Sequence, residues 1–71
     1  MNYDEMVIVK FLSGSPETFF SRKEIARHAV KRDVYEQNTR WADAPLNSLV
    51  GQGFVELNKR GCYRIKEGVV I

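Results

Sequence analysis

The chain has little of the chemistry that metal centres, disulfides and active sites require. Its 71 residues include one cysteine, Cys62, and one histidine, His28. A lone cysteine forms no internal disulfide, and a structural metal site needs three or four ligands. The carboxylates are scattered rather than paired for acid–base work, and no glycine-rich phosphate loop precedes a helix. We therefore expect no metal, no cofactor, no small-molecule substrate and no enzymatic activity.

Long hydrophobic runs are also missing. Crossing a bilayer takes roughly 20 apolar residues, and the most apolar stretch, residues 6–12, is interrupted by Lys10. No basic segment precedes this stretch, as it would in a signal peptide. A single cysteine fits a reducing compartment. These observations predict a cytoplasmic protein that does not insert into a membrane.

Neither sign of charge dominates, since 11 basic and 9 acidic residues leave a formal net charge of +2. The distribution is more informative than the sum. Residues 21–40 hold six basic and three acidic side chains, residues 56–66 hold four basic and one acidic, and residues 41–55 hold a single acid. Two basic zones on either side of a nearly uncharged stretch indicate a polyanionic partner. Simple solvation of the surface by Lys and Arg would give the same pattern.

The length leaves room for one small domain spanning residues 1–71, with a marginal core. The last residues, 67–71, read as an apolar tail that would add a strand or a self-association surface. Average apolar and charged content argues against disorder.

Two capping boxes mark the first two helices. Asn2 and Glu5 stand three residues apart before an apolar helical face, and Ser21 and Glu24 repeat the arrangement. The glycine and proline in residues 13–16 end the first helix. Residues 31–42 contain neither glycine nor proline, so the second helix either stops near Val30 or continues into this segment.

A third helix is predicted to begin with Asp43 as its cap and Pro45 in its first turn, where proline is tolerated. The alternative is a start near Thr39, which would place Pro45 in mid-helix and kink it. Gly51 and Gly53 end this helix. Beyond it, residues 54–57 and 62–66 alternate as two strands of a hairpin around the turn 58–61. Residues 17–20 suit a short third strand.

The order of these segments resembles the winged helix-turn-helix family of DNA-binding domains over most of the chain. The resemblance rests on residues 20–26 (FSRKEIA), residues 46–56 (LNSLVGQGFVE) and residues 61–65 (GCYRI). These look like the start of the second helix, the passage from recognition helix to wing, and the return strand of the wing. The resemblance implies an α+β fold of three helices with a small antiparallel sheet, in which the hairpin is the wing.

The resemblance also implies a binding mode, in which the third helix enters the major groove and the wing touches phosphate or the minor groove. The exposed positions of that helix would be Ala44, Pro45, Asn47, Ser48 and Gln52. Of these, Asn47 and Ser48 are the candidates for base contact. The candidates for phosphate contact are Lys59 and Arg60 in the wing, Arg22, Lys23 and Arg27 in the second helix, and Arg40 in the segment before the third helix.

Two departures from the family pattern bear on function. No Arg or Lys lies between Asp43 and Asn58, and Asp43 would repel a phosphate near the helix start. The connection from Val30 to Asp43 is longer than a tight helix-turn-helix allows. The sequence therefore predicts a duplex-DNA-binding protein, a transcriptional regulator or accessory module, that binds through the wing and second helix. The alternative is a winged-helix module for protein–protein interaction or homodimerisation.

Overall fold

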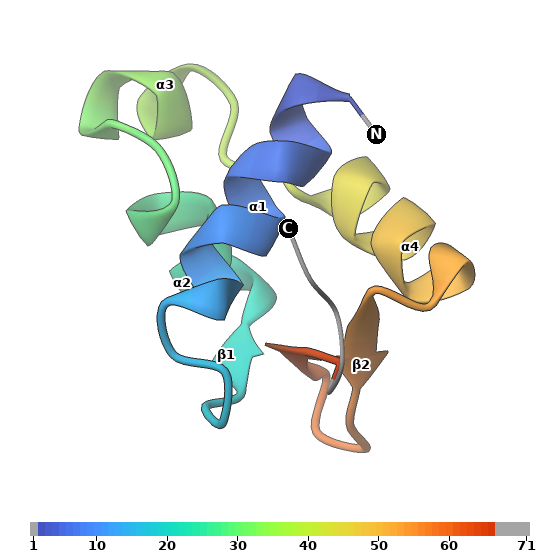
Figure 1. The fold of residues 1–71 in the computed structure, drawn as a ribbon. Coiled ribbons are helices and arrows are strands. Elements are labelled where there is room, and N and C mark those ends of the chain that lie inside the picture. The colour runs from blue at the N-terminus through green and yellow to red at the C-terminus, as the bar shows by residue number, and fades with distance from the viewer. Residues whose placement is uncertain (1, 67–71) are drawn as a thin grey trace.

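The computed structural model of this chain describes residues 2–66, and its fold is α+β (Figure 1). Four helices and a three-stranded antiparallel sheet follow in the order α1 (Tyr3–Ser13), β1 (Phe20–Ser21), α2 (Arg22–His28), α3 (Arg32–Gln37), α4 (Asp43–Gln52), β2 (Val55–Leu57) and β3 (Cys62–Ile65). In Figure 1 the helices lie above the sheet, and α3 lies at the corner farthest from it. The expected α+β class is confirmed, but the expected count of three helices is wrong, because α3 is a separate element.

Both predicted capping boxes are present. The Asn2 side chain accepts from the amide of Glu5 at 2.8 Å while the Glu5 carboxylate accepts from the amide of Asn2 at 3.0 Å. Ser21 and Glu24 make the same reciprocal pair at 3.1 Å in each direction. Each box satisfies two amides that a helix start would otherwise leave without a partner. Local sequence therefore sets where α1 and α2 begin.

The end of α2 is decided by a distant residue. The indole Nε1–H of Trp41 donates to the backbone carbonyl of Ala26 at 2.9 Å. In a continuing helix that carbonyl would accept from the amide of Val30. The backbone instead becomes extended at Lys31 (ψ 153°), and α3 begins with the next residue. The alternative in which the second helix runs on into residues 31–42 is therefore wrong, and Trp41 is partly buried against the core.

Helix α4 begins close to the predicted point but in a different way. Ala42 is the N-cap and Asp43 is the first helical residue, so Asp43 is not the cap. Pro45 lies in the first turn as predicted, which excludes the start near Thr39. Pro45 is also buried, so its expected place among the exposed residues of this helix is wrong. Gly53 closes the helix with φ 85°, a conformation that favours glycine.

The sheet contains the predicted hairpin and the predicted third strand, in the spatial order β1-β3-β2. β2 pairs with β3 from Val55 opposite Ile65 to Leu57 opposite Tyr63. β1 is shorter than expected and includes Ser21, which pairs with Cys62 on the other edge of β3. Because β3 is central, the segment before α2 and the β2–β3 hairpin are held in one sheet.

One core joins the helices to the sheet. Its buried apolar side chains are Ile8, Val9 and Leu12 of α1, Ile25 and Ala26 of α2, Ala42, Leu46 and Leu49 at α4, and Val55, Tyr63 and Ile65 of the sheet. Phe20 packs against this core, with its ring centroid 5.0 Å from that of Phe11. Helix α3 buries no residue completely. The core thus fixes α2, α4 and the wing relative to one another and leaves α3 at the periphery.

Within residues 2–66, no helix is long and apolar enough to cross a membrane. The predicted role of the tail concerns residues 67–71, which lie outside the part of the chain described here.

Candidate nucleic-acid interface

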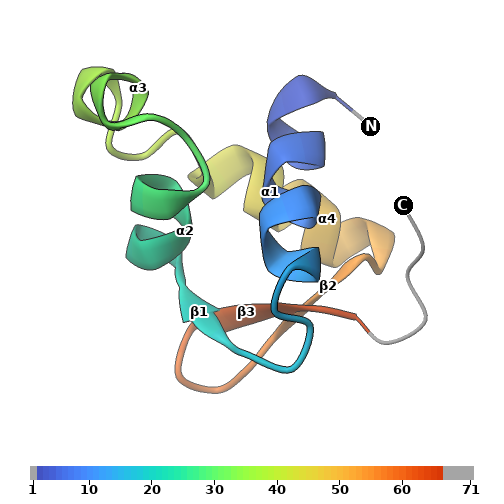
Figure 2. The same ribbon diagram turned by 60° about the vertical axis from the view of Figure 1, so that its left-hand side comes forward.

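The sheet brings the two basic zones of the sequence to one surface. The turn between β2 and β3, residues 58–61, is the turn of the predicted wing, and we call it the wing turn. Ser21, the N-cap of α2, is paired with Cys62, the first residue after this turn. The strands are antiparallel, so the chain leaving Ser21 towards Arg22 runs alongside the chain that leads back to Arg60. Figure 2 shows β1 beside β3, with α2 rising from the same end of the sheet as the wing turn. Ser21 and Cys62, which are 41 positions apart in sequence, are therefore neighbours.

The wing turn is held by a side chain. The carboxamide oxygen of Asn58 accepts from the amides of Arg60 and Cys62, both at 2.9 Å. Gly61 takes φ 81°, which favours glycine, and its amide donates to the Asn58 carbonyl at 3.2 Å. This geometry fixes the backbone and leaves the side chains of Lys59 and Arg60 exposed. Both predicted phosphate contacts of the wing therefore project from a turn that is ordered before any partner binds.

Helix α2, which begins beside that turn, carries two exposed cations of its own. Lys23 and Arg27 are exposed and one helical turn apart. Together with His28, Arg32, Tyr35 and Glu36 they line a hollow of about 630 Å³ between α2 and α3. Arg32 in that hollow is already paired with Glu36 at 2.8 Å.

Four exposed cations of this surface have no ion-pair partner among residues 2–66. We call them the basic quartet: Lys23, Arg27, Lys59 and Arg60. An exposed Lys or Arg without an acidic partner is available to a phosphate without first breaking a protein contact. The quartet is therefore the part of the predicted site most suited to a polyanion.

Arg22 and Arg40 are engaged differently, because both contact Asp43 at the start of α4. Their Nε atoms lie 3.2 Å and 3.6 Å from the two carboxylate oxygens of Asp43. The Oδ1 atom is enclosed and has no hydrogen bond of good geometry within the described chain. The structure thus brings these two predicted phosphate contacts together around an acid that competes with phosphate.

The polar face of α4 is divided between solvent and α1. Asn47 is exposed and makes no side-chain hydrogen bond within the described residues. The Ser48 hydroxyl donates to Glu5 Oε2 at 2.8 Å, and Gln52 Nε2 donates to the same oxygen at 2.7 Å. Of the two predicted base-contacting residues, Asn47 is free to reach a ligand, whereas the Ser48 proton is used inside the fold.

Glu5 is the centre of this α1–α4 contact. Its side chain is only 5% exposed, and it accepts hydrogen bonds from Asn2, Ser48 and Gln52. The backbone hydrogen bond from Asn2 and the hydroxyl of Ser48 lower the pKa of Glu5 below its ordinary value of 4.5. Glu5 is therefore ionised at neutral pH, and its two hydrogen bonds to Ser48 and Gln52 join α1 to α4.

The lowered pKa predicts an acid-sensitive fold. The stabilisation from ionised Glu5 is complete above the unfolded pKa of 4.5 and is lost as the pH falls through the lower folded value. The midpoint of urea unfolding should therefore drop between neutral pH and about pH 3, and it should drop less in Glu5→Gln. Glu17→Gln is the control, since Glu17 is exposed in the loop after α1 and makes no hydrogen bond to α4, so its acid shift should equal that of the native protein. An identical acid shift in native protein and Glu5→Gln would contradict this role.

The sequence did not reveal two parts of this surface. The hollow with Arg32 and His28 was missed because its walls belong to two helices, and the break between them depends on Trp41. The role of Gln52 was missed because its partner Glu5 lies 47 positions away. The spacing of Ser48 and Gln52 by one helical turn was the available signal, but it does not identify a partner.

No cluster of three or more metal-ligating side chains occurs within residues 2–66. Comparison of the chain with protein-family models, with curated proteins and with solved structures found no match.

Proposed function

We propose that this chain is a winged-helix protein that binds duplex DNA, as a transcriptional regulator or an accessory module. The observation that carries the proposal is the pairing of Ser21 with Cys62, which places the start of α2 beside the turn that carries Lys59 and Arg60. Two cations of the quartet come from α2 and two from the wing, so a single phosphate backbone can contact both elements. The expected cytoplasmic location belongs to the same proposal.

The arrangement of elements supports the winged-helix interpretation. A short strand precedes α2 and pairs with the return strand of the hairpin, and the hairpin directly follows α4. In such a domain α4 is the helix that enters the major groove. Asn47 is then the candidate for base contact, because an exposed carboxamide can pair with adenine through two hydrogen bonds. Helix α3 is an addition beside this frame.

Binding in this mode is mostly electrostatic. Helix α4 carries no Lys or Arg, so cations elsewhere supply the affinity and sequence preference is weak. Contacts to phosphate position a protein on the duplex but carry no base information. The expected complex has low sequence specificity and depends strongly on salt.

Titration of the chain with a short random duplex over a series of salt concentrations tests the proposal. With about four phosphate contacts, log K should fall with log salt with a slope of about −3.6. An amide NMR titration with the same duplex should shift signals of the wing turn and of α2 first. Absence of binding at about 50 mM salt, or shifts confined to other surfaces, would contradict the proposal.

Asp43 gives a second test, with a gain of function as its expected result. Asp43→Asn removes a negative charge from the start of α4 and releases Arg22 and Arg40. The affinity for duplex DNA should rise by about fivefold, which corresponds to on the order of 1 kcal/mol for one charge near a phosphate. Fluorescence anisotropy at fixed salt measures this change.

Asp33→Asn is the matched control for this substitution. It makes the same chemical change in the first turn of α3, where the side chain is exposed and contacts neither arginine. Its affinity for DNA should stay close to that of the native chain. Equal gains in the two variants would show that only net charge matters and that Asp43 has no special position.

A further inference from the structure

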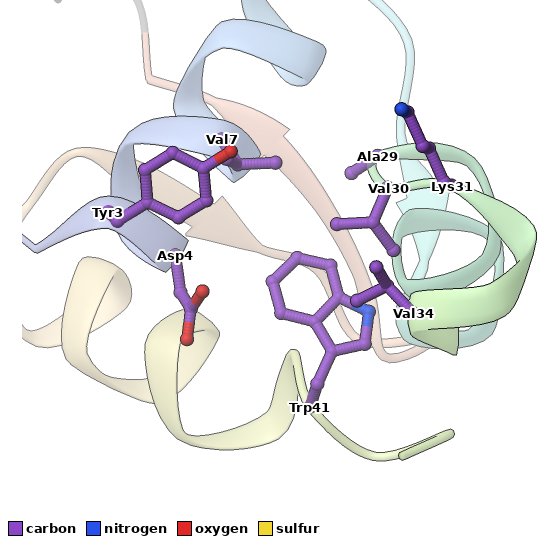
Figure 3. Close-up of a pocket in the computed structure, with 8 residues that line it drawn as sticks. All are labelled: Tyr3, Asp4, Val7, Ala29, Val30, Lys31, Val34 and Trp41. Atoms are coloured by element: carbon purple, nitrogen blue, oxygen red, sulfur yellow. The ribbon is translucent and has the colours of Figure 1, made fainter. Parts of the chain in front are cut away.

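A second hollow, of about 600 Å³, opens between α1 and the segment that joins α2 to α3. Figure 3 shows Tyr3, Asp4 and Val7 on the α1 wall, Val30, Lys31 and Val34 on the opposite wall, and the indole of Trp41 between them. In Figure 1 this region lies at the end of the molecule away from the wing turn. The hollow is therefore separate from the proposed DNA surface.

The walls of this hollow are apolar and open to solvent. The Tyr3 side chain is 78% exposed and that of Val34 is 44% exposed, although both are large and apolar. They stand on opposite walls, and Val7, Val30 and Trp41 between them are only partly buried. Single exposed apolar residues are normal on a protein surface, whereas several gathered around one hollow mark an interaction site.

The charges at this hollow identify its occupant. Asp4 lies on the α1 wall and Lys31 on the opposite wall, and neither has an ion-pair partner within residues 2–66. A surface with an unpaired acid on one wall and an unpaired base on the other is complementary to itself under a two-fold rotation. In such an interface residue i contacts residue j, and j contacts i, so two copies would form the pair between Asp4 and Lys31 twice.

We propose that this hollow is the interface of a homodimer, in which the α1 wall of one copy enters the hollow of a second copy. Tyr3 of each copy projects into the apolar space between the walls of the other. The net charge of +2 is small enough that two copies do not repel strongly. The dimer leaves the basic quartet exposed, so dimerisation does not depend on DNA binding. A dimer of a DNA-binding chain would present two such DNA-binding surfaces.

Sedimentation equilibrium of the full chain and of two charge-reversed variants tests this interface. The native chain should show reversible dimerisation at concentrations up to about 1 mM. In Asp4→Lys both ion pairs become contacts between two lysines, and in Lys31→Asp they become contacts between two aspartates. Each variant alone should dimerise at least about tenfold more weakly than the native chain.

An equimolar mixture of the two variants should dimerise again, because both contacts then join a lysine to an aspartate. This mixture also controls for folding: a variant that failed to fold could not recover by mixing. Glu17→Lys is the matched control, since it reverses an exposed acid in the loop after α1 that does not line the hollow. Its dimerisation should equal that of the native chain.

Three results would overturn the proposal. One is a native chain that stays monomeric up to about 1 mM, which would leave the hollow to a different partner. The second is that Asp4→Lys and Lys31→Asp each dimerise as strongly as the native chain. The third is that the equimolar mixture of these two variants stays monomeric. No DNA is present in these measurements, so their failure leaves the proposed DNA binding untouched.

Discussion

Replacement of the whole basic quartet (Lys23, Arg27, Lys59 and Arg60) by alanine is expected to abolish measurable binding of duplex DNA at physiological salt. The four side chains are exposed and have no ion pair within the described residues, so their removal takes the contacts away without disturbing the core. The formal net charge falls from +2 by four units, which adds repulsion from the phosphates. Each lost contact also makes the salt dependence less steep by about one unit of slope. Fluorescence anisotropy across a salt series measures both effects.

A pair of single lysine variants separates position from net charge. Lys59→Ala should weaken binding to all sequences alike and reduce the slope by about one. Lys10→Ala removes the same charge from the exposed side of α1 and should leave the slope unchanged. A circular dichroism spectrum identical to that of the native chain shows that each variant is folded. Equal losses in the two variants would contradict a localised interface.

Leu46→Ala is expected to have the largest effect on stability. Leu46 is fully buried in the core that joins α4 to α1 and the sheet. Truncation of a buried leucine costs about 2–5 kcal/mol, because apolar surface is lost and a cavity remains. A domain of this length has about 4–10 kcal/mol in total. Thermal denaturation should therefore show a midpoint lower by roughly 10 °C or more.

The matched control for this prediction is Leu57→Ala. Leu57 lies in β2, and its side chain is 50% exposed. The same truncation there removes little buried surface and should cost less than about 1 kcal/mol. A similar loss in both variants would mean that the α4 core is not where the stability lies.

Local sequence was sufficient to predict most of the elements. The two capping boxes set the starts of α1 and α2, and proline fixed the first turn of α4. The β2–β3 hairpin followed from two alternating runs around a turn that contains Gly61, which takes φ 81°. Each of these features depends on residues only a few positions apart, so it can be recognised in the sequence without knowledge of the tertiary structure. The errors were the count of helices, the capping role of Asp43, the exposure of Pro45 and the bounds of β1.

The candidate site was less predictable than the fold. Its residue types were visible as two basic zones, but nothing in the sequence showed that they meet. Ser48 looked as free as its neighbour Asn47, and only the fold shows that its hydroxyl faces Glu5. Arg22 and Arg40 looked like further phosphate contacts, and only the fold places Asp43 between them.

The sequence by itself determined the α+β class, the starts of α1 and α2, the hairpin and the presence of two basic zones. The tertiary structure decided where α2 stops, which polar residues of α4 remain available, and that the start of α2 lies beside the turn between β2 and β3. The physical reason is the range of the interactions. Caps and turns join residues that are neighbours in the chain. The hydrogen bond from Trp41 to Ala26 joins residues 15 positions apart, and the one from Gln52 to Glu5 joins residues 47 positions apart. The pairing of Ser21 with Cys62 joins residues 41 positions apart.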